Sequence, residues 1–124
     1  GTDISDTAKN FKDSIIWDFH DEKEEWVNNF DFVYSNSLDQ SFDPKKALNS
    51  WLNQINKEGF IIIEHSEQHG VIASGKMDPF GVEANYFPYL MSQWFGHKIS
   101  IKIIQSIKKN KANSPVWLFI LKKI

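Results

Sequence analysis

The sequence predicts an α/β domain whose mostly parallel sheet ends in an antiparallel hairpin. Three observations lead to this prediction: a strand–helix–strand pattern over residues 30–66, an isoleucine run without alternation at residues 61–63, and two apolar segments separated by the polar stretch KKNKANS. A chain of 124 residues suits one hydrophobic core. We therefore expect a single domain over residues 1–124.

The first 30 residues are expected to form short elements. Residues 2–5 have the pattern of a strand, and a helical turn at residues 6–11 follows, capped by Ser5 or by the acid after it. Residues 14–17 form a second apolar strand. The early acids of residues 22–28 then favour the start of a helix.

The central unit is predicted to be a strand, a helix and a second strand. Residues 30–35 are apolar at both alternating sets of positions, so we expect cover on both faces of this strand. Asp43 caps a helix with Pro44 at its first position, and Gly59 ends it. Residues 59–64 form a second strand covered on both faces. Because a helical crossover joins them, the two strands are predicted to be parallel.

Residues 66–96 are predicted to be rich in loops, with one short aromatic helix at residues 85–95. We interpret this segment as a variable insertion that caps the sheet, with a lid over a substrate as the alternative. Residues 98–107 and 115–124 then form the closing hairpin.

Composition excludes several classes of function. The chain lacks arginine and has a net charge of −2, which disfavours sequence-specific readout of nucleic acid. No apolar run is long enough for a membrane-spanning helix, so no membrane partner is expected. The chain has no cysteine, and we take it to be cytoplasmic.

Three motifs occur in a characteristic order: GTDIS, WDFHD, and a unit that includes FDFVYSNSLDQ, FDP and NKEGFIIIE. Together they resemble the C-terminal part of the class I S-adenosylmethionine-dependent methyltransferases. The resemblance implies a Rossmann-like methyltransferase fold, S-adenosylmethionine as cofactor and an unidentified methyl acceptor.

The resemblance also implies cofactor-binding residues. Asp3, with its neighbour Ile4, would bind the ribose hydroxyls, and Asp18 and Phe19 would bind the adenine. Ser35 and Asn36 follow a strand, where they would contact cofactor or acceptor. Solvated acids at strand ends, and hydrogen bonds within the turn, are the structural alternatives.

Two departures from the family pattern matter. Asp39 and Gln40 stand where the family often has glutamate and histidine, so the general base is missing and no catalytic residue is assigned. The family's first strand and glycine-rich loop have no counterpart, so we expect an N-terminally truncated domain. The strands ending near Asp3 and Ser35 must then pair directly, stay apart or borrow a strand, which would give a homodimer through an exposed sheet edge.

The acceptor side is predicted to include Asp39, His65, Tyr86 and Trp94, with His65 at the mouth of the cleft. The segment EHSEQH, residues 64–69, superficially suggests metal binding, but its order is not HExxH, and we predict no metal site. Three functions stay open: a methyltransferase, a non-catalytic methyltransferase-like module that binds a partner or dimerises, and a metal-dependent hydrolase.

Overall fold

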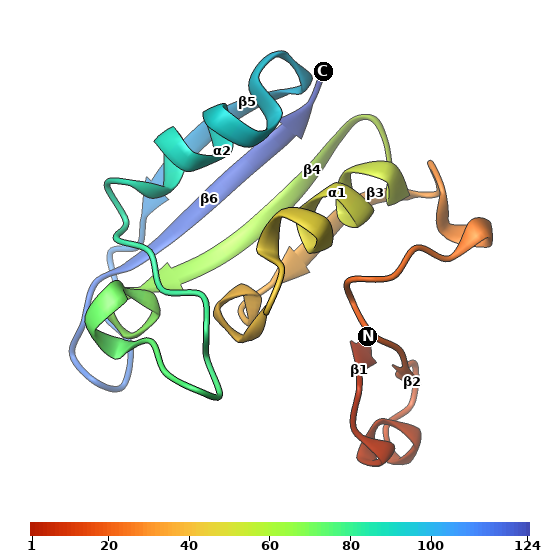
Figure 1. Cartoon of the computed structure of the whole chain (residues 1–124), viewed down its shortest axis with the longest axis horizontal. Helices are drawn as coiled ribbons and strands as arrows, with labels where there is room; N and C mark the ends of the chain where they lie inside the picture. Colours follow the sequence, from red (N-terminus) through yellow and green to blue (C-terminus); the bar gives the residue numbers. More distant parts are fainter.

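The computed structural model describes residues 1–124 and contains a four-stranded sheet, two α-helices and a small N-terminal segment (Figure 1). The elements are β1 (Thr2–Asp3), β2 (Ile15–Ile16), β3 (Phe30–Ser35), α1 (Pro44–Gln54), β4 (Ile55–Ser66), α2 (Phe87–Phe95), β5 (Ile99–Gln105) and β6 (Val116–Lys123). Short 3-10 turns lie between them, including Asp6–Asn10, Glu24–Trp26 and Glu67–His69.

The larger sheet has the strand order β3-β4-β6-β5. Strands β3 and β4 are parallel, as the helical crossover predicts. Strand β6 is antiparallel to both β4 and β5, so the closing hairpin is confirmed. The chain's last strand thus lies inside the sheet, between β4 and β5.

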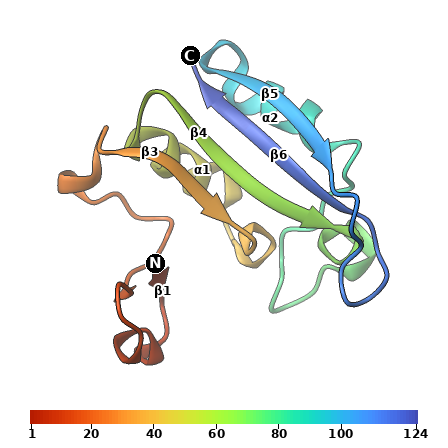
Figure 2. The ribbon, with the colours of Figure 1, turned by 180° about the vertical axis from the view of Figure 1, so that it is seen from behind.

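Strands β1 and β2 form a separate two-stranded parallel sheet. Neither strand pairs with β3, so the outer edge of β3 has no partner strand. Of the three arrangements considered for the strands ending near Asp3 and Ser35, the structure shows the one in which they stay apart. Both views of the ribbon place the small sheet beyond the free edge of β3 (Figures 1 and 2).

Cover by helices is one-sided, and the prediction of cover on both faces was wrong. Helices α1 and α2 lie on the same face of the larger sheet, whose other face is open in the view from behind (Figure 2). Ile61 and Ile63 are buried, whereas Phe32 and Tyr34 are 60% and 51% exposed. An apolar run satisfies strand propensity on either face, so it does not by itself report burial.

Helix α1 begins as predicted, because the Asp43 side chain accepts a hydrogen bond from the Lys46 N–H. It ends at Gln54, however, and not at Gly59, which lies inside β4. The register between β3 and β4 shifts near this glycine. A Cβ on Gly59 would lie 3.0 Å from the Asp31 carbonyl oxygen, so the glycine permits the close approach of two backbones.

The N-terminal segment forms less regular structure than expected. The Ser5 side chain caps the predicted turn by accepting from the Thr7 N–H. The acids of residues 22–28 give only the 3-10 turn Glu24–Trp26 and no α-helix. Acids suit the first turn of a helix, but only an apolar face packed on a core sustains the following turns.

The hydrophobic core lies between the larger sheet and its two helices. Fifteen buried residues form one cluster, and Phe87, Met91 and Phe95 of α2 belong to it. The segment 66–96 therefore supplies part of the core as well as surface loops. None of the helices combines the length and apolar character needed to cross a bilayer.

Candidate ligand groove

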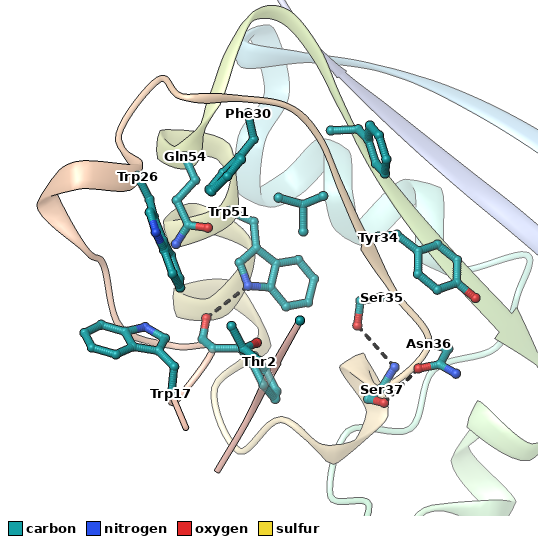
Figure 3. A pocket seen from close by; sticks show the side chains of 14 residues that line it. Thr2, Trp17, Trp26, Phe30, Tyr34, Ser35, Asn36, Ser37, Trp51 and Gln54 are labelled. Carbon is teal, nitrogen blue, oxygen red and sulfur yellow. Dashed lines mark hydrogen bonds between the residues drawn. The ribbon is translucent and has the colours of Figure 1, made fainter. Parts of the chain in front are cut away.

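A groove of about 450 Å³ lies between the N-terminal segment and the free edge of β3 (Figure 3). We call it the groove. Its volume falls within the range of small-molecule sites. It is lined by Gly1, Thr2, Trp17, Phe19, Trp26, Phe30, Phe32, Val33, Tyr34, Ser35, Asn36, Ser37, Trp51 and Gln54.

The walls of the groove are aromatic and uncharged. Seven of the 14 lining residues carry aromatic rings, and none has a charged side chain. The rings of Trp17 and Trp26 lie 5.7 Å apart, and the Lys23 ammonium sits over both. Of the three tryptophans that line the groove, Trp51 is buried, and Trp17 and Trp26 are partly exposed. Such walls suit a flat, apolar ring system.

One end of the groove is polar, where β3 finishes at Ser35. The Ser37 N–H donates to the Ser35 hydroxyl at 3.1 Å, and the Ser37 hydroxyl donates to Asn36 Oδ1 at 3.0 Å (Figure 3). These hydrogen bonds lie within the turn at the carboxyl end of a parallel strand, the position where α/β sheets bind ligands. The exposed Asn36 side chain still has an amide group for a ligand.

Three of the six predicted cofactor residues line the groove: Phe19, Ser35 and Asn36. The other three, Asp3, Ile4 and Asp18, do not line it. The carboxylate of Asp3 is exposed and accepts from the Ser5 N–H at 2.7 Å, and Ile4 is also exposed. Asp18 lies between Trp17 and Phe19, which both line the groove.

A buried histidine that the sequence did not single out fixes Asp18. His20 is 3% exposed, and its Nδ1 lies 2.6 Å from Asp18 Oδ1. On the other side of the ring, Nε2 lies 2.6 Å from the Ser41 hydroxyl. The His20 backbone N–H also donates to Asp18 Oδ1 and is the main cause that lowers the pKa of Asp18 below its ordinary value. Asp18 is therefore ionised at neutral pH.

Asp39 and His65 line a second, smaller pocket and not the groove. We predicted His65 at the mouth of the cleft, but the structure places it elsewhere. Its side chain is 4% exposed, behind the rings of Phe87 and Phe119. Burial lowers the pKa of His65 to about 4, so the imidazole is neutral at pH 7. Burial also raises the pKa of Asp39, which lies 3.7 Å from His69 Nε2. Side chains of β4 alternate between buried and exposed positions, and His65 occupies a buried one. The polar residues next to His65 in the sequence gave no indication of this burial.

Tyr86 and Trp94 lie apart from the groove. Tyr86 is exposed beside Tyr89, and Trp94 in α2 packs near Phe80. The EHSEQH segment does not gather into a metal-ligand set: Glu64 accepts from the Tyr34 hydroxyl, and no group of three or more potential ligands is close enough to hold an ion.

Sequence comparison gives no match to a family model or to a curated protein. Comparison with solved structures gives clear matches. The chain is similar to the CMeT domain of citrinin polyketide synthase, with a TM-score of 0.67 and 9% identity over 97% of this chain and 37% of that one. It is also similar to the N-methyltransferase NodS from Bradyrhizobium japonicum WM9, solved with S-adenosyl-L-homocysteine, with a TM-score of 0.65 and 9% identity over 98% of this chain and 64% of that one.

A third match is a possible histamine N-methyltransferase from Thermotoga maritima, a protein described as S-adenosylmethionine-dependent. Its TM-score is 0.60 and its identity 14%, over 89% of this chain and 62% of that one. The chain thus spans 37 to 64% of the length of these three structures. At such identities the likeness is one of fold.

Proposed function

We propose that this chain, which has part of the class I methyltransferase fold, belongs to an enzyme that transfers a methyl group from S-adenosylmethionine to an acceptor. The observation that supports this proposal is the position of the groove. It opens at the carboxyl end of β3 and beside the residues that follow β2, in a chain whose solved relatives in fold are methyltransferases. Ligands of α/β sheets bind at this end of the strands.

The proposed cofactor contacts follow from the chemistry of each side chain. Asp3 would accept hydrogen bonds from the ribose, with Ile4 beside it. Asp18 would accept from the adenine amino group, and the Phe19 ring would contact the base. Ser35 and Asn36 would bind the remaining polar part of the cofactor at the end of β3.

Positioning would supply much of the rate in this mechanism. Methyl transfer moves one carbon between a sulfonium and a nucleophile held in line, so alignment lowers the barrier without a strong acid or base. Among the predicted acceptor residues, Asp39 is nearest in sequence to the polar end of the groove. His65 is buried and neutral at pH 7, so we do not propose it as a proton shuttle.

Isothermal titration calorimetry with S-adenosylmethionine and S-adenosylhomocysteine tests the proposal. We expect the wild-type chain to bind both ligands. The Asp3→Asn and Asp18→Asn variants should each lose roughly tenfold in affinity, because each loses the charge on a hydrogen-bond acceptor. Asp13→Asn is the matched control, since Asp13 is exposed at a φ of 62° that asparagine tolerates. Absence of binding by the wild-type chain would contradict the proposal.

A second candidate function is a module that dimerises through the edge of β3. The specific observation is that this edge has no partner strand and carries the exposed rings of Phe32 and Tyr34. Light scattering after size exclusion should then show a dimer that Tyr34→Lys converts to a monomer. Ile72→Lys, at a fully exposed position outside the sheet, is the control. A wild-type monomer at every concentration would rule this function out.

A further inference from the structure

We infer that His20 is a positioning residue for the proposed adenine site, acting through Asp18 and Phe19. This inference rests on the proposed function and extends it to a residue outside the groove. His20 connects the residues after β2 to Ser41, in the loop that precedes α1, through both nitrogens of its ring. It therefore fixes one wall of the groove relative to the larger sheet.

The hydrogen-bond directions follow from the chemistry of the partners. An ionised carboxylate only accepts, so the Nδ1 of His20 carries a hydrogen that it donates to Asp18 Oδ1. When the ring is neutral, Nε2 accepts from the Ser41 hydroxyl at 2.6 Å. The Ser41 oxygen accepts in turn from the Asp43 N–H at the start of α1. This chain of bonds selects one tautomer of His20.

The same bonds leave one oxygen of Asp18 available. Oδ1 receives two N–H donors, from the backbone and the ring of His20, at 2.9 and 2.6 Å. Oδ2 has no donor within the protein, and the Asp18 side chain is 38% exposed. Because rotation of the carboxylate would break both bonds to Oδ1, the free oxygen keeps a fixed direction. That oxygen suits an amino group and disfavours a carbonyl oxygen in the same place.

Packing holds the His20 ring in its plane. It lies between the rings of Phe19 and Phe42, with centroid separations of 4.5 and 4.0 Å. The backbone is held as well, since the Ser50 hydroxyl donates to the His20 carbonyl and the Trp51 indole N–H donates to the Phe19 carbonyl. Phe19, which lines the groove, is thus fixed by the same contacts.

A histidine whose two ring nitrogens contact an aspartate and a serine also occurs in the catalytic triads of nucleophilic hydrolases. Here Ser41 is 1% exposed and does not line the groove. A substrate carbonyl cannot approach the buried hydroxyl, so the geometry points to positioning and not to nucleophilic attack.

The ligand test compares S-adenosylhomocysteine with S-inosylhomocysteine, which carries a carbonyl oxygen in place of the adenine amino group. The wild-type chain should prefer the adenine form, and His20→Ala should reduce that preference roughly tenfold by freeing the carboxylate to rotate. His20→Asn should restore part of the preference, because its amide can still donate to Asp18. His97→Asn, at an exposed histidine, is the control.

A merely structural role would lower both affinities equally and leave their ratio unchanged, which would overturn the inference. A wild-type chain that binds neither ligand would instead refute the proposed function. The geometry of His20 has its own readout, the ¹⁵N spectrum of the imidazoles. We expect a hydrogen on Nδ1 and none on Nε2 in the wild-type chain, and loss of this tautomer preference in Asp18→Asn. Equal population of both tautomers in the wild-type chain would also overturn the inference.

Discussion

The N-terminal 29 residues and the rest of the chain are held in place by different forces. All 15 residues of the hydrophobic core lie in the larger sheet, its helices and their loops. Within residues 1–29, only Ala8 and His20 are buried, and hydrogen bonds attach the segment to α1, among them Trp51 to Phe19 and Ser50 to His20. The groove therefore has one wall built on the core and one wall that hydrogen bonds to α1, together with the packing of Phe19 on the core, hold in place.

The largest expected effect is in the core. Phe119 is fully buried in β6, and its ring stacks on Phe87 at 4.3 Å. Phe119→Ala should lower the free energy of unfolding by about 3–5 kcal/mol, because it leaves a cavity between sheet and helix. Urea titration followed by circular dichroism measures the loss. Phe11→Ala, at an exposed ring of the N-terminal segment, should cost far less, and equal losses would contradict the comparison.

The second effect is a pH dependence of the free energy of unfolding, caused by the buried imidazole of His65. The pKa of His65 is lowered from 6.5 to about 4 by burial, so the unfolded chain binds a proton before the folded chain does. Stability from the neutral ring is therefore complete above pH 6.5 and falls, by up to about 3 kcal/mol, as pH drops toward 4.

Urea titrations of the wild-type chain and His65→Gln across this pH range measure that contribution as the difference between the two slopes. His97→Gln, which removes an exposed histidine, should keep the wild-type slope. An unchanged slope in His65→Gln would show that burial does not hold this imidazole neutral.

A smaller effect is expected where the two regions meet. Trp51→Phe keeps a buried ring on α1 but removes the indole N–H that donates to the Phe19 carbonyl at 3.0 Å. The loss should be about 1 kcal/mol and should act locally on the attachment of residues 1–29. Hydrogen exchange should then speed up in this segment while the amides of β4 and β6 stay protected. Uniform acceleration along the chain would show one cooperative unit instead.

The smallest effect concerns an exposed ion pair between the two regions. Lys46 Nζ lies 2.9 Å from Asp21 Oδ1, and both side chains are more than half exposed. Solvent screens such a pair, so Lys46→Ala should leave the unfolding midpoint and the exchange pattern unchanged. A clear release of residues 1–29 would show that charge, and not hydrogen bonding to α1, fastens this wall.

Much of the fold was predictable because its signals are local. The Asp43 cap, Pro44 and helical spacing located the start of α1, and apolar runs located β3 and the closing hairpin. The end of α1 was misplaced because Gly59 is a usual helix stop, whereas here it serves a close backbone approach inside β4. A glycine has several uses, and only its neighbours in space distinguish them.

The candidate site was predictable only in part. Phe19, Ser35 and Asn36 line the groove, although β2 and β3 belong to different sheets. The hydrogen bond from the Trp51 indole to the Phe19 carbonyl brings the residues after β2 to the groove, and motif order does not reveal that contact. The aromatic walls were not predicted, since ring content alone does not distinguish a buried cluster from the wall of a groove. His20 carries a weak signal, a histidine two residues after Asp18, and its partner Ser41 lies 21 residues away.

The sequence alone determined the elements of the larger sheet and the parallel crossover between β3 and β4, because capping, periodicity and chain handedness act over short stretches. Tertiary packing, which no local pattern reports, places β6 between β4 and β5, both helices on one face of the sheet, and His65 toward the core. It also decided that His20 links Asp18 to Ser41. These outcomes depend on contacts between residues far apart in the chain, which packing selects after the local elements have formed.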